Sequence, residues 1–191
     1  MKNLKYLILF LLILLIASVY FYLRTNSLPA AVVNWSFISQ SEIDDYYNMS
    51  HNYLVLASTS NSDLQTLAAT STQKDIKRAV IEKLIENKLI YAEAQKRVGN
   101  DLKEIANQKI QNALKTIDIN DAVNKMFGIS IENYTEEELL PDAYKEILQG
   151  RMDASGEDFN NWLENAKNNA HVFILIPGYY WDGKSVKISL K

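Results

Sequence analysis

The side chains that most often catalyse reactions or bind metals are few in this chain and are poorly placed for either task. Its two histidines, His51 and His171, lie far apart, and no His-x-x-x-His pair could hold zinc. There is no cysteine, which removes thiol nucleophiles, disulfides and lipidated cysteine anchors. No Gly-x-Ser-x-Gly motif or glycine-rich phosphate loop is present. We therefore expect no metal or cofactor, and an enzyme with an unrecognised site is the weakest hypothesis.

Carboxylates occur in two short runs, Asp44-Asp45 and Glu136-Glu137-Glu138. Adjacent residues on a helix point in different directions, so such runs rarely converge on one atom. We predict that both runs are solvated helix faces or helix N-termini. The net charge is −3 and no basic cluster is present, which excludes nucleic acid as an expected partner.

Aromatic and methionine side chains are the remaining candidates for a binding surface. Tyr46, Met49 and Tyr53 share one predicted helix, and Tyr134 lies further along the chain. Such side chains offer adaptable apolar area to a variable partner, so these four are the predicted client-binding residues. Because neighbours on a helix diverge, Tyr46 and Tyr47 cannot both face inward. The alternative is that most of these aromatics pack the core.

One apolar run dominates the N-terminus. From Tyr6 to Leu23 the chain has 18 residues without a formal charge, enough to cross a hydrocarbon layer of about 30 Å. Lys2 and Lys5 precede this run, so the positive-inside rule keeps the N-terminus in the cytoplasm and exports the rest. A cleaved signal peptide is the alternative, although its apolar region is usually shorter. We predict a transmembrane signal anchor at 1–23, a tether at 24–31 and one domain at 32–191.

Helical patterning covers most of that domain. Ser39 and Glu42 form a capping box in front of a helix over 40–56. The clearest helix spans 73–98, where apolar residues recur every three or four positions and Gly99 follows. Residues 57–72 are small and polar and predict a mobile loop. Further helices are predicted over 101–117, 119–127, a short segment after Ser130, 141–152, and 155–169 with Ser155 as its N-cap.

Strands are predicted at both ends of the domain, over 31–35 and 171–176. Asp182-Gly183 indicates a two-residue hairpin turn between 179–181 and 185–190. The predicted fold class is therefore mostly α: an N-terminal transmembrane helix followed by a helical domain, with a small antiparallel sheet formed by the N- and C-terminal strands.

Four segments, taken in order, are similar to one known family. They are Val32-Val33-Asn34 with Ile38-Ser39-x-x-Glu42; Val80-Ile81-x-x-Leu84-Ile85-x-x-x-Leu89-Ile90-x-x-x-Ala94; Met126-Phe127-Gly128-Ile129-Ser130-Ile131-Glu132-Asn133-Tyr134; and Phe159-x-x-Trp162-Leu163 with Ala170-x-Val172-x-Ile174. Over about residues 31–176 they resemble the N-terminal chaperone domain of the SurA/PrsA-type extracytoplasmic foldases. Each segment is mainly helix patterning, and it is their order that carries the resemblance.

The resemblance also shows what this chain lacks. In that family a parvulin prolyl-isomerase domain commonly follows or interrupts the chaperone domain, between helices that correspond to those ending near Met152 and starting near Glu157. Only Asp153-Ala154-Ser155-Gly156 stands there, and the paired histidines and Gly-Gly-x-Leu-Gly segment of parvulins have no counterpart. The resemblance therefore implies chaperone activity without isomerase activity.

The expected function is that of a membrane-anchored extracytoplasmic holdase. Its expected partners are unfolded or newly exported polypeptides and the membrane, the latter through residues 6–23, with the 57–72 loop gating an apolar groove. The alternative is a non-catalytic assembly module of the cell envelope, which docks one folded partner or self-associates through exposed strands.

Overall fold

The structure is a computed structural model that describes residues 27–59, 62–115 and 117–189, together with residues 6, 10–13, 15 and 19 and without the side chains of 62–64 and 67. Most of the predicted anchor and residues 24–26 of the predicted tether lie outside these residues. The tether prediction is wrong at its end, because residues 29–31 belong to a strand. Among the described residues, no helix is both long and apolar enough to cross a membrane.

The described chain from residue 27 onward is mostly helical, as predicted, with two small antiparallel sheets. Its elements in order are β1 (Pro29–Val33), β2 (Ser36–Ser39), α2 (Gln40–Ser58), α3 (Ser62–Thr70), α4 (Gln73–Val98), η1 (Gly99–Asp101), α5 (Leu102–Leu114), α6 (Asn120–Phe127), α7 (Ile131–Tyr134), η2 (Thr135–Leu139), α8 (Leu140–Ser155), α9 (Phe159–Asn169), β3 (Val172–Ile174), β4 (Tyr179–Trp181) and β5 (Val186–Ile188).

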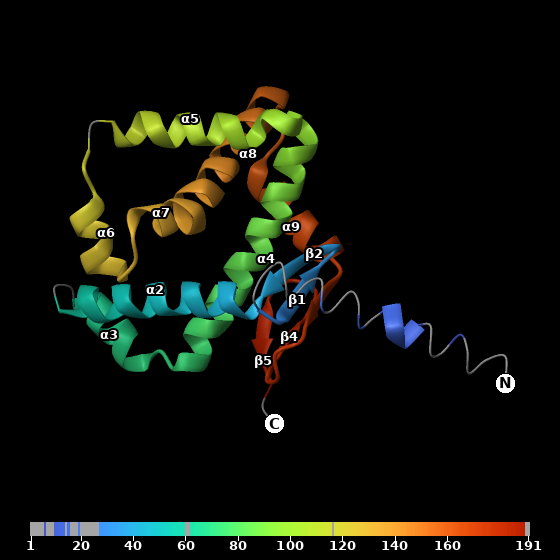
Figure 1. The fold of residues 1–191 in the computed structure, drawn as a ribbon, viewed down its shortest axis with the longest axis horizontal. Coiled ribbons are helices and arrows are strands. Elements are labelled where there is room, and N and C mark those ends of the chain that lie inside the picture. Colours follow the sequence, from blue (N-terminus) through green and yellow to red (C-terminus); the bar gives the residue numbers. More distant parts are fainter. Residues whose placement is uncertain are drawn as a thin grey trace.

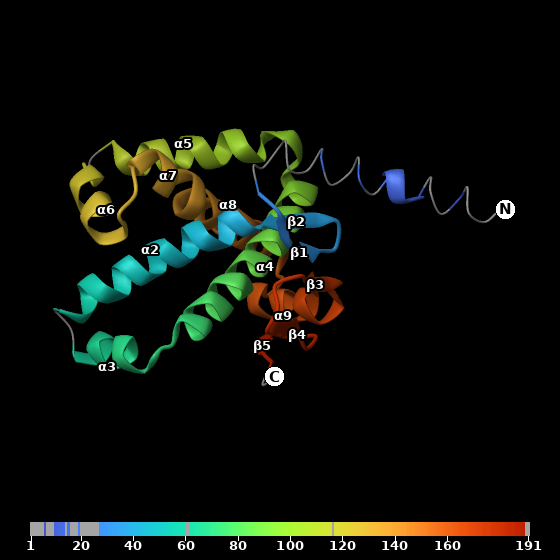
Figure 2. The same ribbon diagram turned by 60° about the horizontal axis from the view of Figure 1, so that its bottom comes forward.

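Helix α4 is the spine of the molecule. In Figure 1, α5 runs across the top and α2 lies lower in the view, above α3; α4 rises from below α2 to the level of α5, and α7 and α8 lie between α2 and α5. Figure 2 shows α9 and the C-terminal strands on one side of α4, with α5, α7 and α8 on the other. Helix α4 packs against the elements on both sides because it carries apolar residues on two faces.

Two apolar cores share α4. The first, here called the sheet core, consists of Ala30, Ala31, Val33, Ile38, Ile43, Tyr46, Met49, Val80, Ile81, Leu84, Ile85, Leu89 and Val186. The second, here called the helical core, consists of Ile90, Ala94, Leu102, Ala106, Ile110, Leu140, Ala143, Tyr144, Leu148, Met152 and Phe159. Helix α4 passes from one to the other between Leu89 and Ile90, so neither core is complete without it.

The N-terminal half of the domain confirms one prediction and overturns another. The Ser39 hydroxyl accepts from the Glu42 N–H at 3.1 Å, and the Glu42 carboxylate accepts from the Ser39 N–H at 3.4 Å, which confirms the capping box. The loop predicted over 57–72 is wrong, because α3 occupies most of it. Leu64, Leu67 and Ala68 have helical spacing there, and α3 packs on α2.

After α4 in the chain, several helices begin or end at capping residues. Gly128, with a φ of 74°, ends α6 as predicted, and Ser130 caps α7. A π-helical turn, η2, joins α7 to α8 without a break. Ser155 is not the N-cap of the last helix, because α8 continues through it. Asp158 takes that role, accepting from the Asn161 N–H at 2.7 Å.

The sheet prediction is confirmed in part. Strand β1 pairs with β3 in antiparallel fashion, which joins the two ends of the domain. Trp35 lies in a turn rather than a strand, and β2 returns along the other edge of β1, giving the order β2-β1-β3. Strands β4 and β5 form a separate two-stranded sheet. Their turn is longer than the predicted two residues, because Asp182 accepts from the Lys184 and Ser185 N–H groups.

Charged side chains on α4 connect it to its neighbours. Lys77 pairs with Asp44 and Lys88 with Glu42, both on α2, at 3.0 and 2.9 Å. On another face of α4, Arg97 binds both oxygens of Glu157 at 2.7 and 2.8 Å. Such pairs add little energy when exposed, so the packing of α4 against its neighbours depends mainly on the two cores.

Candidate peptide-binding cleft

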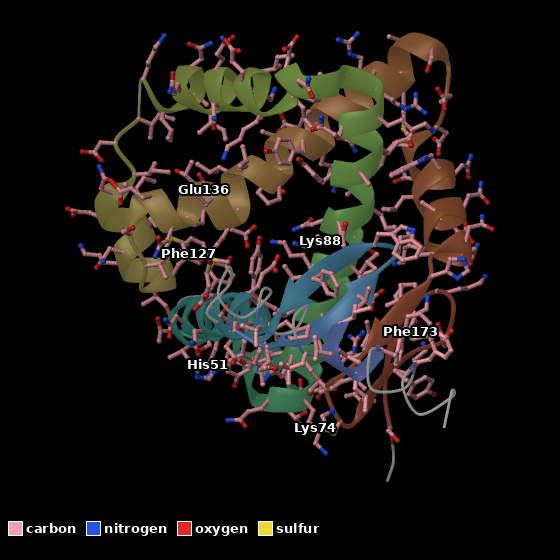
Figure 3. All side chains as sticks on the ribbon, turned by 45° about the vertical axis from the view of Figure 1, so that its right-hand side comes forward. His51, Lys74, Lys88, Phe127, Glu136 and Phe173 are labelled. Carbon is pink, nitrogen blue, oxygen red and sulfur yellow. The ribbon has the colours of Figure 1, made fainter. Side chains whose placement is uncertain are left out.

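A cleft of about 290 Å³ lies where α2, α4, η2 and α8 meet. Figure 3 labels Lys88 on α4 and Glu136 on η2, two of the residues that border it. Its lining consists of Glu42, Tyr46, Leu84, Asn87, Lys88, Tyr91, Glu136, Glu137, Pro141 and Tyr144. The cleft is therefore built between the sheet core and the helical core, on the helix that they share.

Three tyrosines from three helices provide the apolar surface of this cleft. Tyr46 on α2 is 3% exposed and Tyr144 on α8 is 8% exposed, so both are held firmly by the cores. Tyr91 on α4 is 44% exposed, and its ring meets that of Tyr144 at a centroid distance of 5.1 Å and an angle of 56°. Tyr91 is thus the aromatic group of the cleft that a partner can most easily reach.

The charged side chains that line the cleft are mostly acidic. Three carboxylates (Glu42, Glu136, Glu137) face one ammonium, that of Lys88. Lys88 is already paired with Glu42 at 2.9 Å. Burial raises the pKa of the Tyr46 hydroxyl, and nearby carboxylates, Glu138 first among them, raise it further. The cleft therefore favours neutral or positively charged groups.

Two residues that line the cleft each carry one buried polar atom without a hydrogen bond within the described chain. These atoms are Nδ2 of Asn87, a donor, and Oε2 of Glu137, an acceptor. A buried polar atom without a partner costs about 1–3 kcal/mol. A peptide group carries one N–H donor and one C=O acceptor, which is the chemical complement of this pair.

The four predicted client-binding residues do not form one site. Met49 is 1% exposed in the sheet core, where a client has no access to it, and Tyr46 borders the cleft without projecting from it. Tyr53 and Tyr134 do not line the cleft; both stack on Phe127, at centroid distances of 5.6 and 4.9 Å, and Tyr134 packs against the edge of the sheet core. Apolar side chains at helical spacing are drawn into the core first, and this explains where Tyr46 and Met49 lie.

The other residues of the cleft were missed by the sequence analysis. Tyr91 and Tyr144 were not singled out, and Glu137 was assigned to a solvated carboxylate run. Glu137 is instead partly buried, within the π-helical turn η2. Such a turn contains an extra residue and so changes which side chains face the neighbouring helix. The sequence did contain one signal for this site: Tyr91 follows Ile90 on the clearest amphipathic helix.

Replacing Glu137 with glutamine tests the electrostatics of the cleft. Burial raises the pKa of the Glu137 carboxyl above its ordinary 4.5, and the nearby Asp45, Glu138 and Glu42 raise it further. The folded chain then holds this proton more tightly than the unfolded chain, so Glu137 reduces stability as the pH rises above 4.5. Glu137→Gln is expected to raise stability at neutral pH and to flatten this decline.

The measurement is urea denaturation of the full chain in detergent at pH 4.5 and at neutral pH. The same exchange at the exposed neighbour, Glu136→Gln, should change the profile less. Equal profiles for Glu137→Gln and the wild type would contradict the assignment of Glu137 to a desolvated position.

Gly128 lies beside the hydrogen bond between Asn52 and Phe127, and replacing it tests how much that hydrogen bond stabilises the fold. A Cβ added at Gly128 would lie 2.6 Å from Nδ2 of Asn52, the atom that donates to the Phe127 carbonyl at 3.0 Å. Gly156 has nearly the same φ, 73° against 74°, and nothing within 4 Å of its added Cβ. Alanine at Gly156 should cost about 1–2 kcal/mol of left-handed backbone strain. At Gly128 the lost hydrogen bond should add about 0.5–1.5 kcal/mol.

Thermal unfolding of Gly128→Ala and Gly156→Ala, measured in parallel, checks this difference. If both variants unfolded at the same temperature, Asn52 would contribute nothing to holding α6 against α2.

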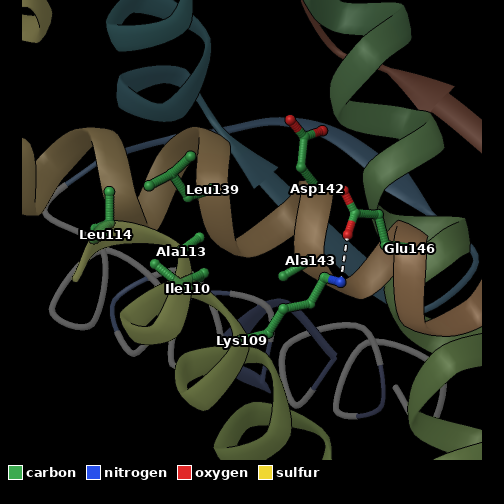
Figure 4. Close-up of a pocket in the computed structure, with 8 residues that line it drawn as sticks. All are labelled: Lys109, Ile110, Ala113, Leu114, Leu139, Asp142, Ala143 and Glu146. Carbon is green, nitrogen blue, oxygen red and sulfur yellow. Dashed lines mark ion pairs between the residues drawn. The ribbon is translucent and has the colours of Figure 1, made fainter. Parts of the chain in front are cut away.

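A second, more apolar crevice of about 200 Å³ lies between α5 and α8 (Figure 4). Ile110, Ala113, Leu114 and Leu139 line it. The ion pair between Lys109 and Glu146, at 2.7 Å, closes one side. It carries no unpaired buried polar atom among the described residues, so its chemistry suits a small apolar knob rather than a polypeptide backbone.

The remaining chemical candidates stay apart in the structure. His51 is exposed on α2 and stacks on Tyr47 at 5.9 Å, whereas His171 precedes β3. In the part of the chain that the structure describes, no group of three or more acidic or histidine side chains is placed to hold a metal ion.

With the fold and the cleft in view, comparison with known proteins identifies the family. The chain belongs to the SurA-like N-terminal domain family, whose model matches residues 1–164. The match contains every residue that lines the cleft, and β3, β4 and β5 lie beyond it. The predicted resemblance is thus confirmed. No curated protein matches the chain, and no solved structure matches it.

The fold also bears on whether a further domain interrupts this one between α8 and α9. Only Gly156, Glu157 and Asp158 separate α8 from α9, so no domain is inserted at this point. Membership of the family indicates a chaperone-like role in binding other proteins, and the SurA-like N-terminal domain is a non-catalytic module.

Proposed function

We propose that this protein is a holdase: a chaperone, not an enzyme, that binds unfolded or newly exported polypeptides and keeps them from aggregating. Family membership supports the general role. The observation that carries the specific proposal is the cleft, where the partly exposed Tyr91 lies among residues that include Asn87 and Glu137, each with one buried polar atom that lacks a hydrogen bond within the described chain. An extended segment placed there would cover Tyr91 with a side chain, and its backbone groups would reach the two buried polar atoms only if the walls of the cleft moved apart.

The proposal also assigns the protein a place. The apolar run over residues 6–23 acts as a single-pass anchor, with the N-terminus in the cytoplasm and the domain on the extracytoplasmic side. A holdase fixed at the membrane has a high effective concentration near polypeptides that emerge there. The charge asymmetry around the run supports this orientation.

Aggregation of a chemically unfolded client tests the proposal directly. The full chain, reconstituted in nanodiscs, should suppress light scattering by a reduced or denatured client in proportion to its concentration. Empty nanodiscs provide the control for lipid effects. If a stoichiometric excess of the protein left aggregation unchanged, the holdase proposal would fail.

The second candidate function is an assembly module that docks one folded partner. The apolar crevice between α5 and α8 favours it, because a small cavity of this kind fits a projecting side chain of a native protein. Saturable binding to one native partner, abolished by Ala113→Arg and accompanied by no effect on unfolded clients, would select this function over the holdase.

A further inference from the structure

The outer face of the sheet β2-β1-β3 carries an unusual amount of exposed apolar surface. Val32 pairs with Phe37 on one side and with Phe173 on the other, so these three side chains form a row across the sheet. Phe37 is 50% exposed and Phe173, labelled in Figure 3, is 66% exposed. The residues on the opposite face, Ala31 and Ile38, are fully buried in the sheet core.

Further exposed apolar residues lie close to this row, just outside the strands. Leu28 and Leu175 are 67% and 55% exposed at the end where β1 begins. Trp35, in the turn between β1 and β2, is 95% exposed. Single exposed apolar residues are normal on protein surfaces, but several large ones on one small sheet indicate a surface that contacts something apolar.

The segments that form this face contain no formal charge. Neither the stretch from Thr25 to Ser41 nor that from Ala170 to Trp181 has a lysine, arginine, aspartate or glutamate. A partner that binds through ionic contacts has nothing to pair with here. Tryptophan and phenylalanine without charges suit the layer between lipid headgroups and acyl chains.

The path of the chain places this face beside the proposed anchor. The Ser27 hydroxyl accepts from the Ser41 N–H at 2.8 Å and the Leu28 carbonyl accepts from the Gln40 N–H at 2.8 Å, so the start of β1 is fixed to the start of α2. The apolar run ends at Leu23, and the five residues from 24 to 28 can span at most about 18 Å. The start of β1, where this face begins, therefore stays within about 18 Å of the end of the apolar run.

We infer that the outer face of the sheet β2-β1-β3 rests in the interfacial layer of the lipid bilayer, with Trp35 and Phe173 inserted among the headgroups. This inference rests on the membrane anchor of the proposed function. None of the residues that line the cleft belongs to these strands, so the contact leaves the cleft open. It gives the domain a fixed orientation above the membrane.

Fluorescence quenching by brominated lipid tests the inference on the full chain in vesicles of zwitterionic phosphatidylcholine. The difference between wild type and Trp35→Phe isolates the emission of Trp35, an exposed residue whose exchange leaves the core intact. The difference between wild type and Trp162→Phe isolates Trp162, which packs against the helical core. Bromine near the headgroup should quench Trp35 severalfold more than Trp162, and neither added salt nor anionic lipid should change this.

Three results would overturn the inference, and each has a different meaning. If carbonate extracts the chain from the vesicles, the anchor itself fails and the lipid contact fails with it. If the chain stays inserted but Trp35 is quenched no more than Trp162, the anchor stands and the sheet face is off the membrane. If Trp35 becomes shielded only as the protein-to-lipid ratio rises, a second copy covers the face instead of lipid.

Discussion

Replacing Leu148 with alanine is expected to lower the free energy of unfolding by about 2–5 kcal/mol, the range for deleting a buried leucine side chain. Leu148 on α8 is 0% exposed and lies in the helical core. The loss should not stay local, because α4 supplies residues to both cores. We expect the sheet core to unfold in the same transition.

Two tryptophans report on the two cores separately. Trp162 packs against the helical core and Trp181 against the sheet core. Urea denaturation of the full chain is followed in two variants, one that keeps Trp162 and one that keeps Trp181. The two unfolding transitions should coincide, and Leu148→Ala should shift both to the same lower urea concentration. Leu56→Ala removes the same side chain from a position that is 42% exposed, and it should change stability by only about 0.5 kcal/mol. A Trp181 transition that did not move in Leu148→Ala would show two independent units.

Replacing Tyr91 with alanine is expected to weaken the binding of an unfolded client about tenfold, which corresponds to about 1.4 kcal/mol. Tyr91 is the aromatic group of the cleft with the most exposed area, so a client would bury it and lose that contact in the variant. Its partner ring, Tyr144, remains in the helical core. The variant should therefore fold and still bind poorly.

Tyr180 provides a matched control for this experiment. It is 51% exposed on β4, close to the 44% of Tyr91, and it does not line the cleft. The affinities of Tyr91→Ala and Tyr180→Ala for a fluorescently labelled client, measured by anisotropy, should differ about tenfold. Equal affinities would mean that clients bind elsewhere, and thermal unfolding of both variants would show whether either loss reflects misfolding.

The most local features of the fold were predictable from sequence. The helix over 73–98 was predicted with its observed bounds, because its apolar spacing and Gly99 are written within the segment itself. The Ser39–Glu42 capping box was predicted because both partners belong to one turn. The prediction failed where local signals competed. The polar composition of 57–72 predicted a loop where α3 forms, and Ser155 was predicted as the N-cap of α9 instead of Asp158.

The candidate site was largely beyond the reach of sequence analysis. Its lining comes from α2, α4, η2 and α8, which are brought together only when both cores form. Of the four predicted residues, only Tyr46 borders the cleft, and it does so from a buried position. Helical spacing indicates that a side chain is apolar and shares a face with others, but not whether a neighbouring helix covers that face completely.

By itself, the sequence determined the helical class, the family and an uncharged N-terminal run long enough for an anchor, because each is a property of composition or of local spacing. Tertiary structure alone decided which tyrosines remain accessible, and that Asn87 and Glu137 line one cleft with one buried, unbonded polar atom each. It also decided that Phe37, Val32 and Phe173 line up on one exposed face. These features depend on contacts between residues distant in the chain, whose burial is set by the packing of whole helices and strands.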